Sequence, residues 1–200
     1  HERNQAFREL GCQVVETQVS RFGTNPFSEF RTFLRFIKVV RQERPDVILT
    51  YTVKPNIYGS LAAQICRVPY LATVTGLGAV FQSSGLLQRV SAILQRFAFR
   101  KAQRVFFQNA DNLETFQRLS IVSSQGTVVP GSGVNLEPHR FEPFPPAGGK
   151  TRFITVSRIR QDKGYDELFD AIVTVCARRD DVEFHIVGWY EDDSYQDTVA

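Results

Sequence analysis

The chain has 200 residues, 42 % hydrophobic and 12 % aromatic, and a formal net charge of +3. This composition suffices for a buried core and excludes an intrinsically disordered chain, which combines low hydrophobicity with high net charge. No apolar run reaches the length of about 20 residues that a membrane-spanning helix needs. The three cysteines, Cys12, Cys66 and Cys176, form no Cys-x-x-Cys pair. They argue against a disulfide framework or structural zinc site and favour a reducing, cytoplasmic compartment.

Strand-like and helix-like patterns alternate along the chain, which predicts an α/β fold with parallel sheets. Strands are expected at 13–17, 47–51, 70–74, 104–108, 127–129, 152–157 and 182–187. Helices are expected up to Gly11, at 27–43, from Asn56 (as the capping residue), at 86–102, from Asp111 and at 165–178. Residues 137–150 are rich in proline and glycine and predict a linker between domains at 1–136 and 151–200. Because the chain lacks methionine and opens within a helical pattern, we expect an internal piece of a longer protein.

Two basic residues follow the predicted strand 152–157. Arg158 leaves its carboxyl end, and Lys163 precedes the helix that begins at Tyr165. Ligands of open α/β sheets bind at this edge, where cations and a helix amino terminus can face one anion. The pattern therefore predicts a phosphate site, although two solvated surface cations would fit it equally well. No Asp-x-Asp pair occurs, so we expect neither a metal nor another cofactor.

A second group of basic residues falls on the predicted helix 86–102 and just beyond it: Arg89, Arg96, Arg100, Lys101 and Arg104. No acidic residue interrupts this stretch. An ordinary surface helix would explain it, and peripheral contact with anionic lipid is the functional alternative. Nucleic-acid binding is not expected, because the aromatic and glycine motifs of RNA readers are absent.

Three motifs together resemble retaining glycosyltransferases of family 4, and more narrowly the bacterial members that extend polyprenyl-diphosphate-linked saccharides. They are TYTVKPNIYGSLAA at 50–63, VTGLG at 74–78 and PGSGVN at 130–135, with support from 107–111 and 157–164. The resemblance covers nearly the whole chain in order. It implies the GT-B fold, in which two Rossmann-like domains face each other across the active site; here the second domain would be truncated. The first strand would precede His1, and the sugar-gripping Glu-x7-Glu segment would follow Ala200.

The resemblance also implies roles for residues of this chain. Arg158 and Lys163 match the pair that holds the donor diphosphate, as the catalytic residues. The other implied site residues are Lys54, Asn56, Thr75, Gly76, Gly78, Gly131, Ser132, Gly164 and Gly188, which would contact substrates. Many family members carry histidine where this chain has Thr75, so no histidine role is transferred. Lys54 could contact an acceptor phosphate or be solvated, and Asn56 is expected to cap its helix.

The function that the resemblance implies is transfer of a sugar from a nucleotide-diphospho sugar, expected to be a UDP-sugar, to a polyprenyl-diphosphate-linked saccharide. The partners would then be this donor, the lipid-linked acceptor and an anionic membrane surface. The enzyme would be cytoplasmic, with a peripheral position at the inner face of the plasma membrane. Two alternatives remain: a nucleotide-sugar epimerase of the same fold, and a non-enzymatic basic binding module. The isolated piece is expected to be inactive.

Overall fold

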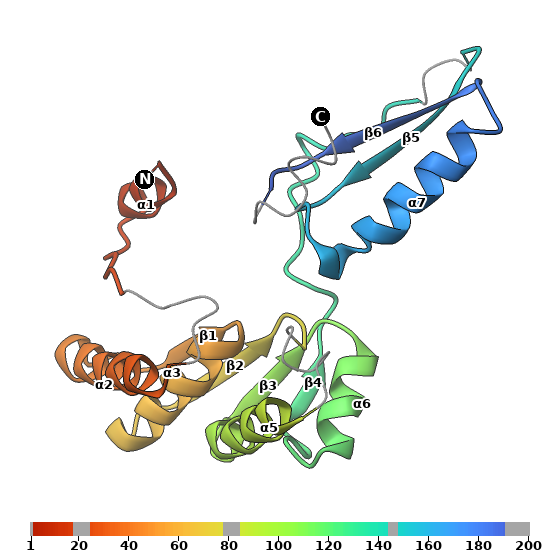
Figure 1. The fold of residues 1–200 in the computed structure, drawn as a ribbon. Helices are drawn as coiled ribbons and strands as arrows, with labels where there is room; N and C mark the ends of the chain where they lie inside the picture. The colour runs from red at the N-terminus through yellow and green to blue at the C-terminus, as the bar shows by residue number, and fades with distance from the viewer. Residues whose placement is uncertain (1, 18–24, 78–84, 144–147, 191–200) are drawn as a thin grey trace. The chain divides into compact units, whose positions relative to one another are not determined.

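The computed structural model describes residues 2–17, 25–77, 85–143 and 148–190. The chain divides into two compact units, unit 1 (His1–Val134) and unit 2 (Asn135–Ala200). Each unit is built around its own parallel sheet (Figure 1). The α/β class predicted from the alternating patterns is therefore confirmed.

Unit 1 holds a four-stranded parallel sheet in the order β1-β2-β3-β4. The strands are β1 (Ile48–Tyr51), β2 (Tyr70–Val74), β3 (Arg104–Phe107) and β4 (Gly126–Val128). Tyr51 pairs with Thr73, and Thr73 pairs with Phe106. The carboxyl ends of neighbouring strands consequently meet at one edge of the sheet, which is where ligands bind in open α/β sheets.

Five helices are described in unit 1: α1 (Glu2–Glu9), α2 (Pro26–Glu43), α3 (Val53–Cys66), α5 (Leu86–Phe99) and α6 (Ala110–Arg118). Local capping explains several of their ends. Asn25 accepts a hydrogen bond from Phe27 N at the start of α2, and Asn109 accepts one from Asn112 N at the start of α6. Gly11, with φ +82°, ends α1 as predicted.

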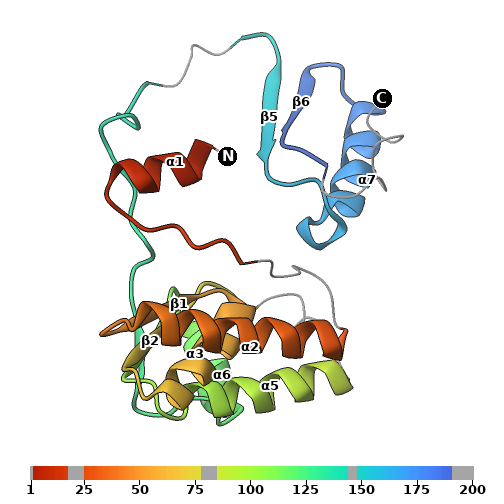
Figure 2. The ribbon, with the colours of Figure 1, turned by 90° about the vertical axis from the view of Figure 1, so that its left-hand side faces the viewer.

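The helix α3 occupies a central place in unit 1. It packs on β1 and β2 and contacts α2 on one side and α5 on the other, so these three helices form one layer (Figure 2). Beneath it, alternate strand residues such as Ala72, Val74, Val105 and Phe107 are buried. The core of unit 1 thus lies between this sheet face and the helices.

Unit 2 contains a two-stranded parallel sheet of β5 (Thr151–Val156) and β6 (Val182–Val187). A short 3₁₀ turn, η1 (Gln161–Lys163), and helix α7 (Tyr165–Cys176) connect the two strands. Ile159 and Tyr165 are buried, and Leu168, Phe169 and Ile186 pack against them. The small core of unit 2 therefore lies under the turn that links β5 to α7.

Two local predictions were wrong. Residues 13–17 form no strand, because they pair with no other strand in the described part of the chain and a strand needs a neighbour for its backbone hydrogen bonds. Asn56 does not cap a helix, since α3 already begins at Val53, after Thr52, whose φ is +67°. The loop between β1 and α3 is therefore shorter than the sequence suggested.

Candidate functional site

The candidate site residues of unit 1 follow the carboxyl ends of its strands. Lys54 and Asn56 lie in the first turn of α3 after β1, and Thr75 and Gly76 directly follow β2. Gly131 and Ser132 follow β4. The structure therefore brings these predicted residues to one edge of one sheet. Gly78 lies outside the described residues.

Lys54 is held by a carboxylate from a neighbouring helix. Its Nζ donates to Glu29 Oε1 at 2.6 Å, and the Tyr58 hydroxyl donates to the other oxygen, Oε2, at 2.7 Å. The exposed fractions of the Lys54 and Glu29 side chains are 21 % and 16 %. Burial, together with the hydrogen bond to Glu29 and its negative charge, raises the pKa of Tyr58 well above its usual range. Lys54 thus belongs to a three-residue network and is not a simple solvated cation.

Asn56 is buried inside α3, with an exposed fraction of 2 %. Its Nδ2 donates to the backbone oxygen of Thr73 at 2.9 Å. Tyr51 is the last residue of β1 and pairs with Thr73, so no later β1 residue can bond to β2. The Asn56 amide supplies a donor to β2 at this point. Asn56 therefore fixes the end of β2, and with it the start of the loop at Thr75. Its Oδ1 has no partner within the described part of the chain.

The segments after β2 and β4 are open. Thr75 is exposed, and a Cβ added at Gly76 would meet nothing within 4 Å. After β4, Gly131 adopts φ +84° and its N–H donates to Val129 O at 2.8 Å, which forms a tight turn. Gln108, after β3, donates to the Ser132 hydroxyl at 3.4 Å. Polar side chains that follow β3 and β4 therefore meet at this edge.

In unit 2, Arg158 and Lys163 occupy the connection from β5 to α7, as the sequence predicted. Arg158 lies two residues beyond the end of β5 and is half-buried, whereas Lys163 ends η1 and is exposed. Gly164 adopts φ +76°, and its N–H donates to Gln161 O at 3.0 Å. This left-handed residue turns the chain from η1 into α7, a conformation that favours glycine. Gly164 therefore shapes the turn through its backbone.

Gly188 directly follows β6 and lies against the strand connection that carries Arg158. A Cβ at Gly188 would lie inside van der Waals contact with the Ser157 carbonyl. Backbone hydrogen bonds flank this approach, from Ser157 N to Val187 O at 3.1 Å and from Ile159 N to Trp189 O at 3.0 Å. Gly188 is thus required for close backbone packing beside Arg158.

The partners of these residues could not be found from the sequence. Glu29 is 25 residues from Lys54, and its only local signal is that of an acid in the first turn of a helix. Tyr165 is fully buried, and its hydroxyl lies 3.1 Å from Ser157 Oγ. In the sequence, nothing distinguishes Tyr165 from an ordinary helix residue.

The described residues contain no group of three or more His, Cys, Asp or Glu side chains that could hold a metal ion. Nor does any described helix have the length and hydropathy needed to cross a membrane.

Comparison with known proteins identifies the family of the chain. Residues 1–131 match the glycosyl transferase 4-like domain. Over 141 residues the chain is 31 % identical to the N,N'-diacetylbacillosaminyl-diphospho-undecaprenol alpha-1,3-N-acetylgalactosaminyltransferase of Campylobacter jejuni, covering 68 % of this chain and 38 % of that enzyme. The chain thus spans well under half the length of this curated relative.

Solved structures share the fold at low sequence identity. Anabaena HepE in complex with UDP and glucose superposes with a TM-score of 0.71 at 18 % identity, over 100 % of this chain and 53 % of HepE. The UDP-GlcNAc 2-epimerase of Methanocaldococcus jannaschii gives 0.50 at 13 % identity, over 92 % and 55 %. These neighbours confirm the GT-B fold class. With residues 1–131, well over half of its length, matched by the family domain, the chain belongs to the glycosyl transferase 4-like family.

Proposed function

We propose that the protein to which this chain belongs is a retaining glycosyltransferase that moves a sugar from a UDP-sugar to a polyprenyl-diphosphate-linked saccharide. The observation that carries the proposal is the 31 % identity to an enzyme whose acceptor is a diphospho-undecaprenol-linked sugar. The UDP and glucose bound to the structural neighbour HepE support a UDP-sugar donor.

Unit 2 would serve the donor. Transfer expels a diphosphate while positive charge grows on the anomeric carbon, so the protein must stabilise the departing anion. Arg158 and Lys163 flank a turn that leads into the amino terminus of α7, and backbone N–H groups at a helix amino terminus favour anions. Each cation would stabilise the transition state by about 2–4 kcal/mol, the usual cost of removing such a donor. This arrangement needs no metal, and we propose a metal-independent reaction.

Unit 1 would serve the acceptor. Lys54, held by Glu29, is a positioned ammonium group at the carboxyl edge of the sheet, where it could contact an acceptor phosphate. Asn56 would act indirectly, because its amide fixes the end of β2 and thereby the start of the Thr75–Gly76 segment. Gly131 and Ser132 would border the same edge after β4.

The lipid-linked acceptor implies a peripheral position at the cytoplasmic face of the membrane. Basic residues on or just after α5 would contact anionic lipid there: Arg89, Arg96, Arg100, Lys101 and Arg104. All five side chains are exposed. Electrostatic attraction of this kind strengthens peripheral binding by about 1 kcal/mol per basic residue near the surface.

A nucleotide-sugar epimerase is the alternative function, favoured by one observation. The fold is shared with a UDP-GlcNAc 2-epimerase. An epimerase would need acid and base groups at the site. Two carboxylates lie in first helical turns at this edge of unit 1: Glu29, which is bonded to Lys54 and Tyr58, and the exposed Asp111 at the start of α6. The 31 % identity to a glycosyltransferase makes transfer the better supported function.

The test uses the full-length protein with a panel of UDP-sugars and a short-chain polyprenyl-diphosphate saccharide. The proposal expects an extended acceptor from one UDP-sugar, and the new linkage should keep the anomeric configuration of the donor, as read by NMR. The reaction should also persist in EDTA. Conversion of the UDP-sugar without an acceptor would instead identify an epimerase, and an inverted linkage would contradict the retaining mechanism.

A further inference from the structure

The outward side of α2 carries large apolar side chains that are exposed. Phe27, Phe30 and Leu34 are exposed by 87, 61 and 48 %. Their spacing of three and four residues places them on one face of the helix. The opposite face is anchored in unit 1, where Thr32 and Val40 are buried. This aromatic stripe is therefore a genuine surface feature of α2 as it packs in unit 1.

Basic residues occupy the same face of α2. Arg31, Lys38 and Arg41 are exposed and fall on the helical spacing of the stripe. Glu29 points to the other side of α2, where it is bonded to Lys54 and Tyr58 on α3. Among the exposed side chains of residues 26–41 there is no acid. The face thus combines large apolar groups with uncompensated positive charge.

Helix α5 repeats this arrangement. Val90, Ile93 and Phe97 are exposed at the same three- and four-residue spacing. Arg89, Arg96 and Arg100 are exposed among them. The sequence of α5 contains no acid. Two helices of one layer therefore present the same pairing of an apolar stripe with three arginine or lysine side chains.

The two faces are held in fixed relation through α3. Glu29 on α2 bonds to α3, and Gln64 on α3 donates to the Phe97 and Ala98 carbonyls of α5, at 2.9 Å each. In Figure 2, α2 and α5 both run across unit 1, with α5 below α2. The layer is thus a preformed surface that need not fold on binding.

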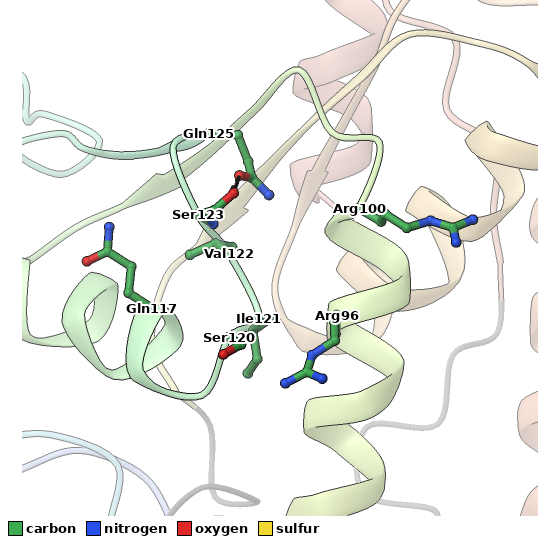
Figure 3. A pocket seen from close by; sticks show the side chains of 8 residues that line it. All are labelled: Arg96, Arg100, Gln117, Ser120, Ile121, Val122, Ser123 and Gln125. Carbon is green, nitrogen blue, oxygen red and sulfur yellow. Dashed lines mark hydrogen bonds between the residues drawn. The ribbon is translucent and has the colours of Figure 1, made fainter.

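The basic side of α5 also borders a cavity of about 530 Å³. Figure 3 shows Arg96 pointing toward Ser120, and its Nη2 donates to Leu119 O at 2.8 Å. Arg100 points away from Ser120, and its guanidinium carbon lies 5.9 Å from the Phe97 ring centroid. The lining contains two arginines and no acid. A phosphate group would therefore meet no negative charge among these lining residues.

We propose that the outward faces of α2 and α5 form a single docking surface for an anionic lipid bilayer. The apolar stripes would enter the boundary between headgroups and acyl chains, and the flanking cations would pair with lipid phosphates. The proposal deepens the proposed function and rests on it for the presence of a lipid-linked acceptor. Its new element is α2, whose aromatic side chains would supply the apolar contact.

The positive charge of this surface favours a lipid bilayer over a protein as its partner. Protein interface cores are depleted in charged residues, whereas interfacial helices combine an apolar stripe with flanking Lys and Arg. Six exposed cations, of which Arg100 is the C-cap residue of α5, accompany six exposed apolar residues on α2 and α5. This mixture fits an anionic lipid surface better than it fits a second folded protein.

The test measures co-sedimentation of the full-length protein with two kinds of vesicle. One kind is phosphatidylcholine alone, and the other also contains roughly 30 mol % phosphatidylglycerol, which gives the surface a strong negative potential. We expect binding to the anionic vesicles that falls as salt is raised. The double variants Phe27→Ser/Phe30→Ser and Arg31→Glu/Lys38→Glu should each weaken it by at least roughly tenfold. Inorganic phosphate at millimolar concentration should not displace the protein, because a bilayer offers many headgroups and the apolar contact.

Matched controls change the same residue types elsewhere on the exposed surface. Leu136→Ser/Val173→Ser and Arg140→Glu/Arg178→Glu should bind vesicles like the wild type. Thermal melts must show that the α2 variants are folded, and transfer to a short-chain soluble acceptor should be unchanged in them. If neither the wild type nor any variant transferred sugar, the proposed function would be overturned. The vesicle measurement would still test the docking surface.

Each of the following vesicle results would overturn the proposed docking surface: equal binding of the wild type to neutral and anionic vesicles, unchanged binding of the folded α2 variants, or displacement by inorganic phosphate alone. A stable dimer that the α2 substitutions disrupt, without vesicle binding, would also overturn it and would assign the face to a second copy of the chain. Sedimentation equilibrium distinguishes that case.

Discussion

Glu29 and Lys54 form a short ion pair that joins α2 to the first turn of α3, with 2.6 Å between Oε1 and Nζ. The second oxygen of the same carboxylate accepts the Tyr58 hydroxyl. Both oxygens of Glu29 are therefore occupied by α3, and the contact positions the Lys54 ammonium group at the carboxyl edge of β1. Its position in the fold makes it both a packing contact and a candidate part of the acceptor site.

The first prediction concerns Glu29→Gln. The amide removes the negative charge that pairs with Lys54, and its nitrogen cannot accept from Tyr58. Because both partners are mostly buried, we expect a loss of about 1–3 kcal/mol in the free energy of unfolding. Urea denaturation measures it. Glu114→Gln on the exposed side of α6 is the matched control, and an equal effect of the two substitutions would contradict the network.

The second prediction concerns the pH range in which Tyr58 ionises. Its pKa is raised by burial and by Glu29. A raised pKa in the folded state means that the associated stability is complete below the unfolded pKa of about 10 and is lost as pH rises above it. In an absorbance titration, Tyr58 should ionise later than the exposed tyrosines. Tyr70, whose pKa burial raises to about 12, should also ionise late. Tyr58→Phe should therefore reduce the late absorbance change by the contribution of one tyrosine, and an unchanged late step would contradict the prediction.

The sequence was sufficient for features that depend on local periodicity. The parallel strands and most helices follow from apolar spacing, and the positions of Arg158 and Lys163 after β5 follow from the chain order alone. The contacts of Lys54 and Asn56 were not predictable, because their partners Glu29 and Thr73 lie 25 and 17 residues away. Asn56 shows the limit most clearly: capping residues and buried amides are the same residue type, and only the position of the helix start separates them.

The third prediction concerns Gly188→Ala. The added methyl group would overlap the Ser157 carbonyl, which is backbone and cannot rotate away. The strand ends must then separate, so we expect unit 2 to lose roughly 1–3 kcal/mol of stability. Thermal unfolding of the full-length protein measures the change. Gly149→Ala is the matched control, because its Cβ would meet nothing within 4 Å. Equal melting temperatures for the two variants would contradict the close approach.

The last prediction separates the two cations of the donor turn from other surface charges. In the full-length protein, Arg158→Ala and Lys163→Ala should each lower sugar transfer by at least roughly tenfold, because each removes a charge that stabilises the departing diphosphate. The loss should appear in kcat as well as in the KM for the UDP-sugar, since negative charge on the leaving group grows in the transition state. Arg178→Ala, an exposed cation beyond the end of α7, should transfer normally. Because Lys163 is exposed and ends a short turn, its removal should leave the melting temperature unchanged, so a loss of activity there reports on chemistry and not on folding. Near-normal transfer by both variants would refute the donor role of this turn.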